Sequence, residues 1–264
     1  MIMKISPFHS LIGIFALTAL ACTGGSGGGG TASDPFQNRS YRVWNAMHDG
    51  VGAVDFFRDS AALETSSSVV ISNDVAQNTP SSRSQFYSGQ TQMNIRVTNP
   101  TGTSTFFSNN VIQLASDRHI ITAYGPGNST AGVVVLPFET SRVDQAKKNQ
   151  IVCAHTLNPA NLSGFPNQLD VHVSTTMTPS ATTKIMSLLT YNPSRPADQV
   201  KLENTNFEGA HNVLFTRTGT LDVVASVSGV NFINGNHYFF VLSKTTTNTP
   251  RVFTWNETYG APAP

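Results

Sequence analysis

Charged side chains are scarce in this sequence of 264 residues, because only 12% of positions carry Asp, Glu, Lys or Arg, against roughly 25% in an average globular chain. The 16 basic and 15 acidic side chains leave a formal net charge of +1. This balance lacks the basic patch that neutralises phosphates, so a nucleic-acid partner is not expected. Only two cysteines are present, which excludes a disulfide-stapled scaffold and a cysteine-ligated metal cluster.

Sequence motifs of common catalytic sites are also missing. The pattern G-x-S-x-G occurs only at Gly24–Gly28, inside a glycine-rich run that predicts a flexible coil and not a nucleophile elbow. The chain has no H-E-x-x-H, no Walker A motif and no calcium loop of the D-x-D-x-D-G type. Acidic residues are scattered, so no pair of carboxylates for glycoside hydrolysis can be assigned. We therefore predict no catalytic residue, no cofactor, no metal site and no enzymatic activity. A hydrolase with an unrecognised site is the least favoured alternative.

Residues 1–21 predict an export signal. Lys4 supplies a positive charge, and Leu11–Ala21 is an apolar stretch that is too short to span a membrane, which takes about 20 residues. The stretch ends in Thr18-Ala19-Leu20-Ala21-Cys22, which resembles the relaxed form of the bacterial lipobox. That resemblance implies that Cys22 becomes the lipidated N-terminus. The alternative is ordinary secretion with cleavage nearby.

Residues 22–38 predict a flexible tether behind that cysteine, because the segment is rich in glycine and serine and has almost no residue large enough to pack. Acyl chains on Cys22 would hold the chain on a membrane. We therefore expect a bacterial cell-envelope protein, on the outer membrane in a Gram-negative cell, facing the periplasm or the cell surface.

The ordered part of the chain contains an internal repeat. Val43 matches Val152, Val54-Asp55-Phe56 matches Leu169-Asp170-Val171, and His119 matches His237. The offset between the copies drifts, as insertions in loops would cause. The repeat predicts one domain over 39–140, a polar linker over 141–149, a second domain over 150–256 and a C-terminal tail over 257–264.

Each copy has the pattern of an all-β domain. Short runs rich in Val, Ile, Thr and Phe recur between clusters of Gly, Pro, Asn and Ser. Segments such as 93–97 and 169–173 alternate apolar and polar residues, which is typical of strands with one buried face. About seven such runs in each copy predict two tandem immunoglobulin-like β-sandwich domains.

A named family shares part of this pattern. Val43–Asp49 followed by Val54–Phe57 resembles the opening motif of the bacterial domain-of-unknown-function family 4397. Later elements of that family resemble segments in both copies, namely Gly89–Val97 and Ser116–Tyr124 in the first and Gly219–Val227 and Asn234–Leu242 in the second. His48 replaces a proline of the motif, and the loop 156–168 is longer than the family's loop. The resemblance implies immunoglobulin-like domains, often in tandem on exported proteins, and no catalytic residues.

Three consecutive phenylalanine pairs are the candidate ligand-binding feature: Phe56-Phe57, Phe106-Phe107 and Phe239-Phe240. Neighbouring strand residues point to opposite faces, so one ring of a pair can leave the core. Phe57 and Phe107 are the candidate rings for stacking on a sugar or filling a partner's pocket. The alternative is burial on both faces, at a domain interface or a sheet end.

The remaining polar and thiol candidates are interpreted as structural. Cys153 lies in the run 151–154, which is apolar on both strand faces and predicts burial by a second sheet and by a neighbouring domain or loop; a Cys22–Cys153 disulfide is the minority alternative. His155 and His172 could face each other across a sheet. The function predicted is a non-enzymatic, lipid-anchored envelope protein with a structural or binding role towards an envelope protein or glycan. The alternative is a carbohydrate- or peptide-binding accessory module that uses exposed aromatics.

Overall fold

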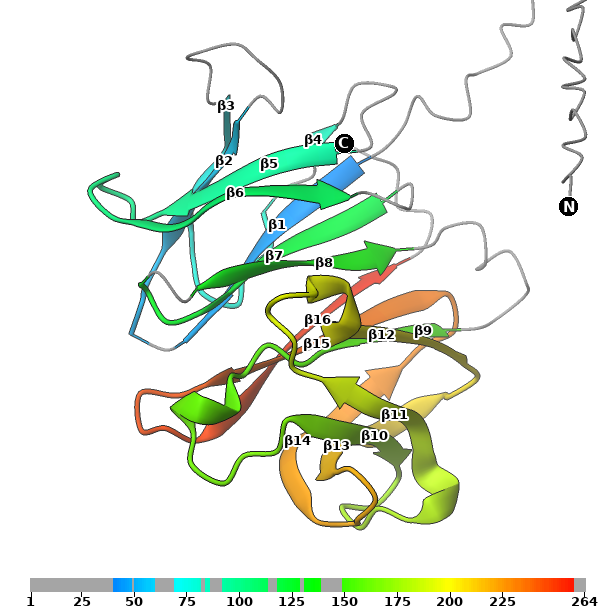
Figure 1. The fold of residues 1–264 in the computed structure, drawn as a ribbon. Coiled ribbons are helices and arrows are strands. Elements are labelled where there is room, and N and C mark those ends of the chain that lie inside the picture. Colours follow the sequence, from blue (N-terminus) through cyan, green and yellow to red (C-terminus); the bar gives the residue numbers. More distant parts are fainter. Residues whose placement is uncertain are drawn as a thin grey trace, which may run out of the picture. The chain divides into compact units, whose positions relative to one another are not determined.

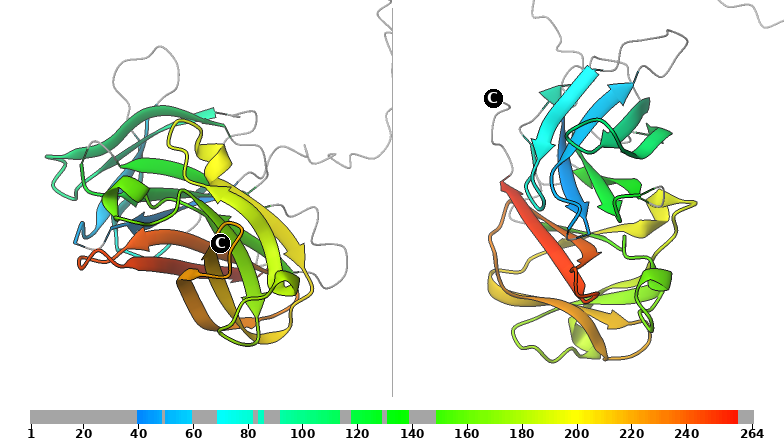
Figure 2. Two further views of the ribbon diagram at one scale, coloured as in Figure 1. Left: turned by 60° about the horizontal axis from the view of Figure 1, so that its bottom comes forward. Right: turned by 90° about the vertical axis from the view of Figure 1, so that its left-hand side faces the viewer.

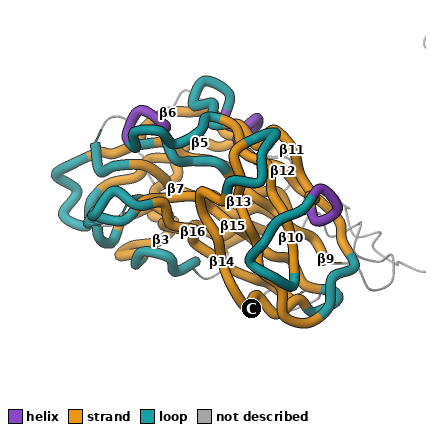
Figure 3. The backbone as a smooth tube through the Cα atoms, turned by 90° about the horizontal axis from the view of Figure 1, so that it is seen from below, coloured by secondary structure: helices purple, strands orange, loops and turns teal. Residues whose placement is uncertain are grey.

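The computed structural model describes residues 40–48, 50–59, 69–81, 84–85, 92–113, 118–128, 131–138 and 149–258. In these ranges the chain forms sixteen β-strands and three short 3-10 helices, and strands make up most of the tube in Figure 3. The predicted signal peptide, Cys22, the tether and residues 141–148 lie outside these ranges. The predicted all-β class is confirmed. No helix within the described ranges has the length and apolar character needed to cross a membrane.

The first eight strands form a sandwich of two four-stranded sheets (Figure 1). We call the sheet β4-β1-β7-β8 the first inner sheet and the sheet β3-β2-β5-β6 the first outer sheet. Their bounds are Ser40–Met47 (β1), Val54–Asp59 (β2), Val69–Val75 (β3), Ser84–Gln85 (β4), Gln92–Thr98 (β5), Thr105–Gln113 (β6), Arg118–Gly125 (β7) and Gly132–Phe138 (β8).

The last eight strands form a second sandwich, drawn from green to red in Figure 2. Its second inner sheet is β12-β9-β15-β16, and its second outer sheet is β11-β10-β13-β14. The bounds are Asn149–Ala154 (β9), Gln168–Ser174 (β10), Lys184–Thr190 (β11), Val200–Thr205 (β12), Gly209–Arg217 (β13), Val223–Phe232 (β14), Asn236–Lys244 (β15) and Pro250–Thr258 (β16), with 3-10 helices at Pro159–Asn161 (η2), Ala181–Thr183 (η3) and Pro196–Gln199 (η4).

The two sandwiches have the same strand order, so the structure contains the repeat that the sequence predicts. In both, the first strand pairs in parallel with the seventh. The residue match made from sequence is wrong in these strands, because Val43 packs inside the first sandwich whereas Val152 packs between the two sandwiches. Each sandwich has eight strands where the sequence pattern predicts about seven. In the first sandwich the additional strand is β4, which has only two residues, too few to form an apolar run. The sandwiches share the immunoglobulin-like architecture of two packed sheets, with a strand order of their own.

Three hydrophobic clusters hold the described chain together. The first lies between the two sheets of the first sandwich and includes Phe56 and Ile95. The second fills the second sandwich and includes Cys153 and Phe215. The third takes side chains from both inner sheets, since Trp44, Tyr124 and Leu136 of the first sandwich cluster with Val152, Phe239 and Phe253 of the second.

The inner sheets are therefore buried on both faces. Along β9, Ile151 and Cys153 belong to the second cluster while Val152 and Ala154 belong to the third. The burial on both faces predicted for residues 151–154 is confirmed, and the neighbouring domain that covers them is the first sandwich. Asn149, assigned to the linker from sequence, already begins β9, and β16 continues through Thr258 into the segment assigned to the tail.

Candidate functional site

The phenylalanine pairs differ in how the structure uses them. Phe239 packs in the third cluster and Phe240 in the second, so this pair is buried on both faces at the interface between the sandwiches. Phe106 and Phe107 both pack against the first cluster, with Phe107 half-buried.

Phe57 is half-buried, and the guanidinium carbon of Arg96 on β5 lies 4.2 Å from the centre of its ring. Strand β5 lies between the β2 strand of Phe57 and the β6 strand of Phe107. The structure does not bring these two candidate rings together, and their role in ligand binding stays a prediction. Cys22, the predicted lipidation site, lies outside the described residues.

The histidine and cysteine candidates have structural surroundings. His155 Nε2 lies 3.1 Å from the carbonyl oxygen of Pro166, whereas His172 contacts Ser180 O and Thr216 Oγ1 through its two ring nitrogens. These two histidines therefore have different partners. Cys153 is fully buried, which raises the pKa of its thiol. Among the described residues, no group of three or more His, Cys, Asp or Glu side chains is arranged to hold a metal ion.

A polar contact joins the sandwiches beside the third cluster. The Tyr124 hydroxyl of β7 donates to Gln199 Oε1 at 3.2 Å, and Gln199 Nε2 donates to the carbonyl oxygen of His155 at 3.1 Å. Burial raises the pKa of Tyr124 to about 12, so its phenol stays protonated and remains a donor. Gln199 ends η4, which contacts both β8 of the first sandwich and β11 of the second. The position of η4 is therefore fixed from both sides.

Both sandwiches carry a buried aspartate that holds a bulge in the third strand. The Asp55 carboxylate accepts from Asp74 N at 2.7 Å, and the Asp170 carboxylate accepts from Leu188 N at 3.2 Å. Asp74 has φ 49° and Leu188 has φ 55°, which is the left-handed region that residues other than glycine, asparagine and aspartate rarely adopt. Register shifts between second and third strands accompany both contacts. The alternation of the sequence predicts that Asp55 and Asp170 point outward and bond a nearby turn; both are instead buried, and each bonds the backbone of the third strand.

Asp170 makes a denser set of contacts than its counterpart. It also accepts from Gly219 N at 3.2 Å and from Lys184 Nζ at 3.4 Å. Burial opposes ionisation of this carboxyl, but the Gly219 and Leu188 amides and the Lys184 ammonium outweigh it and lower its pKa. Asp170 is therefore a stable anion that fixes the backbone of Leu188.

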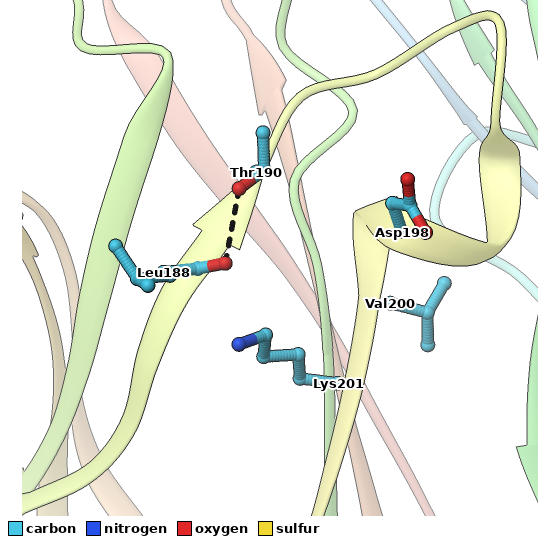
Figure 4. Close-up of a pocket in the computed structure, with 5 residues that line it drawn as sticks. All are labelled: Leu188, Thr190, Asp198, Val200 and Lys201. Atoms are coloured by element: carbon cyan, nitrogen blue, oxygen red, sulfur yellow. Dashed lines mark hydrogen bonds between the residues drawn. The ribbon is translucent and has the colours of Figure 1, made fainter.

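Leu188 lines a hollow of about 410 Å³ at one side of the second sandwich (Figure 4). The hollow lies between β11 and β12, the edge strands of the second outer and inner sheets. Its five lining residues are Leu188 and Thr190 from β11, Asp198 from η4, and Val200 and Lys201 from β12. This volume is within the roughly 300–1,000 Å³ that is usual for ligand sites.

The polar groups of the hollow are arranged along its two walls. The Thr190 hydroxyl donates to Leu188 O at 3.0 Å, and the Lys201 ammonium donates to Ser187 O. Both acceptors are carbonyl groups of the β11 edge. Asp198 is exposed and accepts one hydrogen bond, from Asn192 Nδ2 at 3.1 Å. In Figure 4 the Leu188 and Val200 side chains point away from each other, and the Lys201 side chain lies across the space between the two strands.

The exposed apolar side chains of the described residues also favour the second sandwich. The large ones are Met177, Leu188, Leu221, Val223 and Ile233, and all of them belong to it. Sequence reasoning missed this hollow because it depends on how the edge strands of two different sheets lie beside each other, which no local pattern records. The one available signal was in the repeat, where Leu188 occupies the position that Asp74 holds in the first copy.

The comparisons with known proteins give distant likenesses only. No family model and no curated protein matches the chain, so the resemblance to family 4397 stays a prediction. Among solved structures, a candidate cell adhesion protein from Bacteroides uniformis ATCC 8492 has 10% identity and a TM-score of 0.27, covering 83% of this chain and 98% of that one.

The fimbrial anchor protein Mfa2 from Porphyromonas gingivalis has 11% identity and a TM-score of 0.25, covering 84% of this chain and 98% of that one. A family 26 carbohydrate-binding module from Eubacterium rectale, in complex with maltoheptaose, has 7% identity and a TM-score of 0.24, covering 84% and 98%. At such TM-scores these likenesses carry no argument about what this chain binds.

Proposed function

We propose that this chain is a non-enzymatic bacterial lipoprotein, anchored to the cell envelope through Cys22, whose two sandwiches act as one rigid unit that presents a protein-binding face on the second sandwich. In a Gram-negative cell the membrane is the outer membrane, and the domains belong to the tandem immunoglobulin-like type that family 4397 represents.

The observation that carries the proposal is the third hydrophobic cluster. Domains joined by a small polar interface move relative to each other by default, and a large hydrophobic interface prevents this. Here Trp44, Phe239 and Phe253 are fully buried between the inner sheets. Around them, Arg42 Nε lies 3.6 Å from Glu257 Oε2, and Ser243 Oγ donates to Met47 O at 3.3 Å.

A rigid unit keeps the binding face in one orientation relative to the first sandwich, while the flexible tether predicted over 22–38 sets how far the unit reaches from its anchor. The glycan-binding alternative depends on Phe57 and Phe107, whose rings are half-buried and separated by a strand. The exposed apolar side chains and the hollow are on the second sandwich instead. A protein partner is therefore the better supported ligand class.

The anchor is tested with the full chain expressed in a bacterial host. Wild-type protein is expected to label with a radioactive fatty acid and to partition into the detergent phase, and Cys22→Ser is expected to lose both. Cys153→Ser is the matched control and should keep both, because Cys153 is buried. Detergent partitioning that persists in Cys22→Ser would refute the lipid anchor.

A further inference from the structure

Strand β16 is an edge strand of the second inner sheet that lacks the usual protection against pairing with a further strand. Among the other described edge strands, β4 has two residues, and β3, β6, β11 and β14 are interrupted by register shifts. Strand β8 contains Pro137, and the Lys201 ammonium ties β12 to Ser187 O on β11. Strand β16 instead pairs with β15 over nine residues without a shift, and its single proline is its first residue.

The hairpin that leads into β16 shows which backbone groups point away from β15. Thr245 N donates to Thr249 O at 2.9 Å, so these two residues form a hydrogen-bonded pair. Such pairs alternate with non-hydrogen-bonded pairs along an antiparallel ladder, and the register continues without a break from Lys244 opposite Pro250. The groups on the free edge are therefore the carbonyl of Pro250 and the N–H and C=O groups of Val252, Thr254, Asn256 and Thr258.

This row of groups selects another extended strand as its ligand. No backbone group in the described ranges bonds to them, and an extended backbone presents donors and acceptors at the matching spacing of every second residue. None of the five side chains concerned is charged, so no charge on these residues repels an incoming strand. The right-hand view of Figure 2 shows β16, in red, at the near side of the second sandwich.

The sequence of β16 favours a second copy of β16 as the added strand. Thr254 is the central residue of the nine, so two antiparallel copies that overlap along their whole length place Thr254 opposite itself. The same register sets Val252 opposite Asn256 of the other copy, and all three residues carry free-edge groups. Full overlap and hydrogen bonding are therefore satisfied by one register.

The side chains on the other face of β16 are complementary in that register. Arg251 lies opposite Glu257 of the second copy, and Phe253 lies opposite Trp255, which pairs opposite charges and aromatic rings across the strands. Arg251 is exposed and Trp255 is half-buried, so both have surface left for a partner. Glu257 Oε2 already lies 3.6 Å from Arg42 Nε, and this ion pair holds the carboxylate at the interface face of the strand.

We infer that two copies of this chain associate by antiparallel pairing of their β16 strands about Thr254, which joins two four-stranded inner sheets into one continuous sheet. The contact is isologous, because each copy contributes the same surface. The near balance of 16 basic and 15 acidic side chains leaves little net charge to oppose it. This inference goes beyond the proposed function, since it requires neither the lipid anchor nor a foreign partner.

The first test measures self-association of the full chain by analytical ultracentrifugation in a mild, density-matched detergent. Wild-type protein should show a monomer–dimer equilibrium with a Kd on the order of 10 µM. Arg251→Glu sets two carboxylates opposite each other and should raise this Kd at least about tenfold. Arg195→Glu is the matched control, because Arg195 is also exposed and lies outside β16; it should dimerise as wild type does.

The second test reports the register by disulfide formation. In Thr254→Cys the two thiols lie on directly opposite residues, whose Cα atoms are about 5.5 Å apart, so mild oxidation should link the copies. Asn256→Cys is the comparison. Because Asn256 lies opposite Val252 in this register, its two copies are roughly 14 Å apart along the strands, too far for a disulfide. Wild-type protein, in which Cys153 is buried, sets the background.

Three results would overturn the inference. They are a chain that stays monomeric up to about 1 mM, equal dimerisation of Arg251→Glu and wild type, and crosslinking of Asn256→Cys as fast as that of Thr254→Cys. A dimer that disappears in Cys22→Ser would be held by the lipid and would refute strand pairing as well. A dimer that persists in Cys22→Ser supports strand pairing whatever the anchor experiment shows, so the two proposals fail separately.

Discussion

Phe239 and Phe240 are adjacent in β15 and both fully buried, yet we predict that their truncation to alanine has different effects. Phe240 packs inside the second sandwich, whereas Phe239 packs in the cluster between the sandwiches, with its ring stacked 5.6 Å from that of Trp255. Removing a buried phenylalanine side chain costs about 3–5 kcal/mol. For Phe240→Ala that free energy is lost from the second sandwich itself, and for Phe239→Ala much of it is lost from the contact between the halves.

The assay separates these two free energies. A specific protease site is inserted into the predicted linker 141–149, the folded chain is cleaved, and the halves are analysed by gel filtration and calorimetry. The wild-type halves should co-elute. Phe239→Ala should raise their dissociation constant by roughly a hundred- to several-thousand-fold, so that they separate at micromolar concentration.

Phe240→Ala serves as the comparison, because the ring it removes belongs to the core of one sandwich. Its second half should melt at least about 10 °C lower. If the cleaved Phe239→Ala halves remain together as tightly as the wild-type halves, the third cluster is not what joins the sandwiches. Immediate separation of the wild-type halves would refute the rigid unit as well.

Three further outcomes are expected. Cys153 should resist a thiol reagent until the chain unfolds, since burial raises the pKa of its thiol, and Cys153→Ala should cost about 1 kcal/mol in urea unfolding; rapid labelling of native protein would contradict its burial. Burial lowers the pKa of His155 from 6.5 to about 4, so between these two pH values the unfolded chain is protonated at this residue and the folded chain is not. The free energy of unfolding should therefore be unaffected by His155 above pH 6.5 and fall by at most about 3 kcal/mol as the pH drops from 6.5 through 4. A pH profile that His155→Gln leaves unchanged would show that other groups set it. Asp170→Asn should lower the free energy of unfolding by about 2 kcal/mol at neutral pH. Because the pKa of this carboxyl is lowered, the difference in stability between wild type and variant should shrink as the pH falls through that lowered pKa. A difference that stays constant with pH would show that packing, and not charge, is the cause.

Much of this fold can be predicted from local sequence. The fully apolar run 151–154 predicts a strand covered on both sides, which is confirmed. The alternation in 169–173 predicts a strand with one buried and one exposed face, which is wrong, because Asp170 and His172 are buried as well as their apolar neighbours. The repeat predicts two copies of one strand order correctly, but its match of Val43 to Val152 is wrong, because Val43 packs within its own sandwich and Val152 packs between the sandwiches. The features predicted correctly follow from the periodicity of side chains, which the sequence records directly.

The candidate site could not be predicted in the same way. Its walls come from β11 and from η4 with β12, and their meeting depends on how the two sheets of the second sandwich lie at their edges. The left-handed φ of Leu188 depends on a register shift against β10. No local pattern marks either feature, and a leucine is among the residues least expected to adopt that backbone.

The parallel pairing of β1 with β7, and of β9 with β15, sets an order for folding as the chain emerges from its N-terminus. Neither inner sheet can close until its seventh strand is available, so early contacts are few and the folding of each half is slow. The first sandwich is complete once β8 emerges, while the cluster between the halves awaits Phe253 on the last strand. Until then the apolar face of the first inner sheet is uncovered, and such a face is prone to aggregation until the second half covers it.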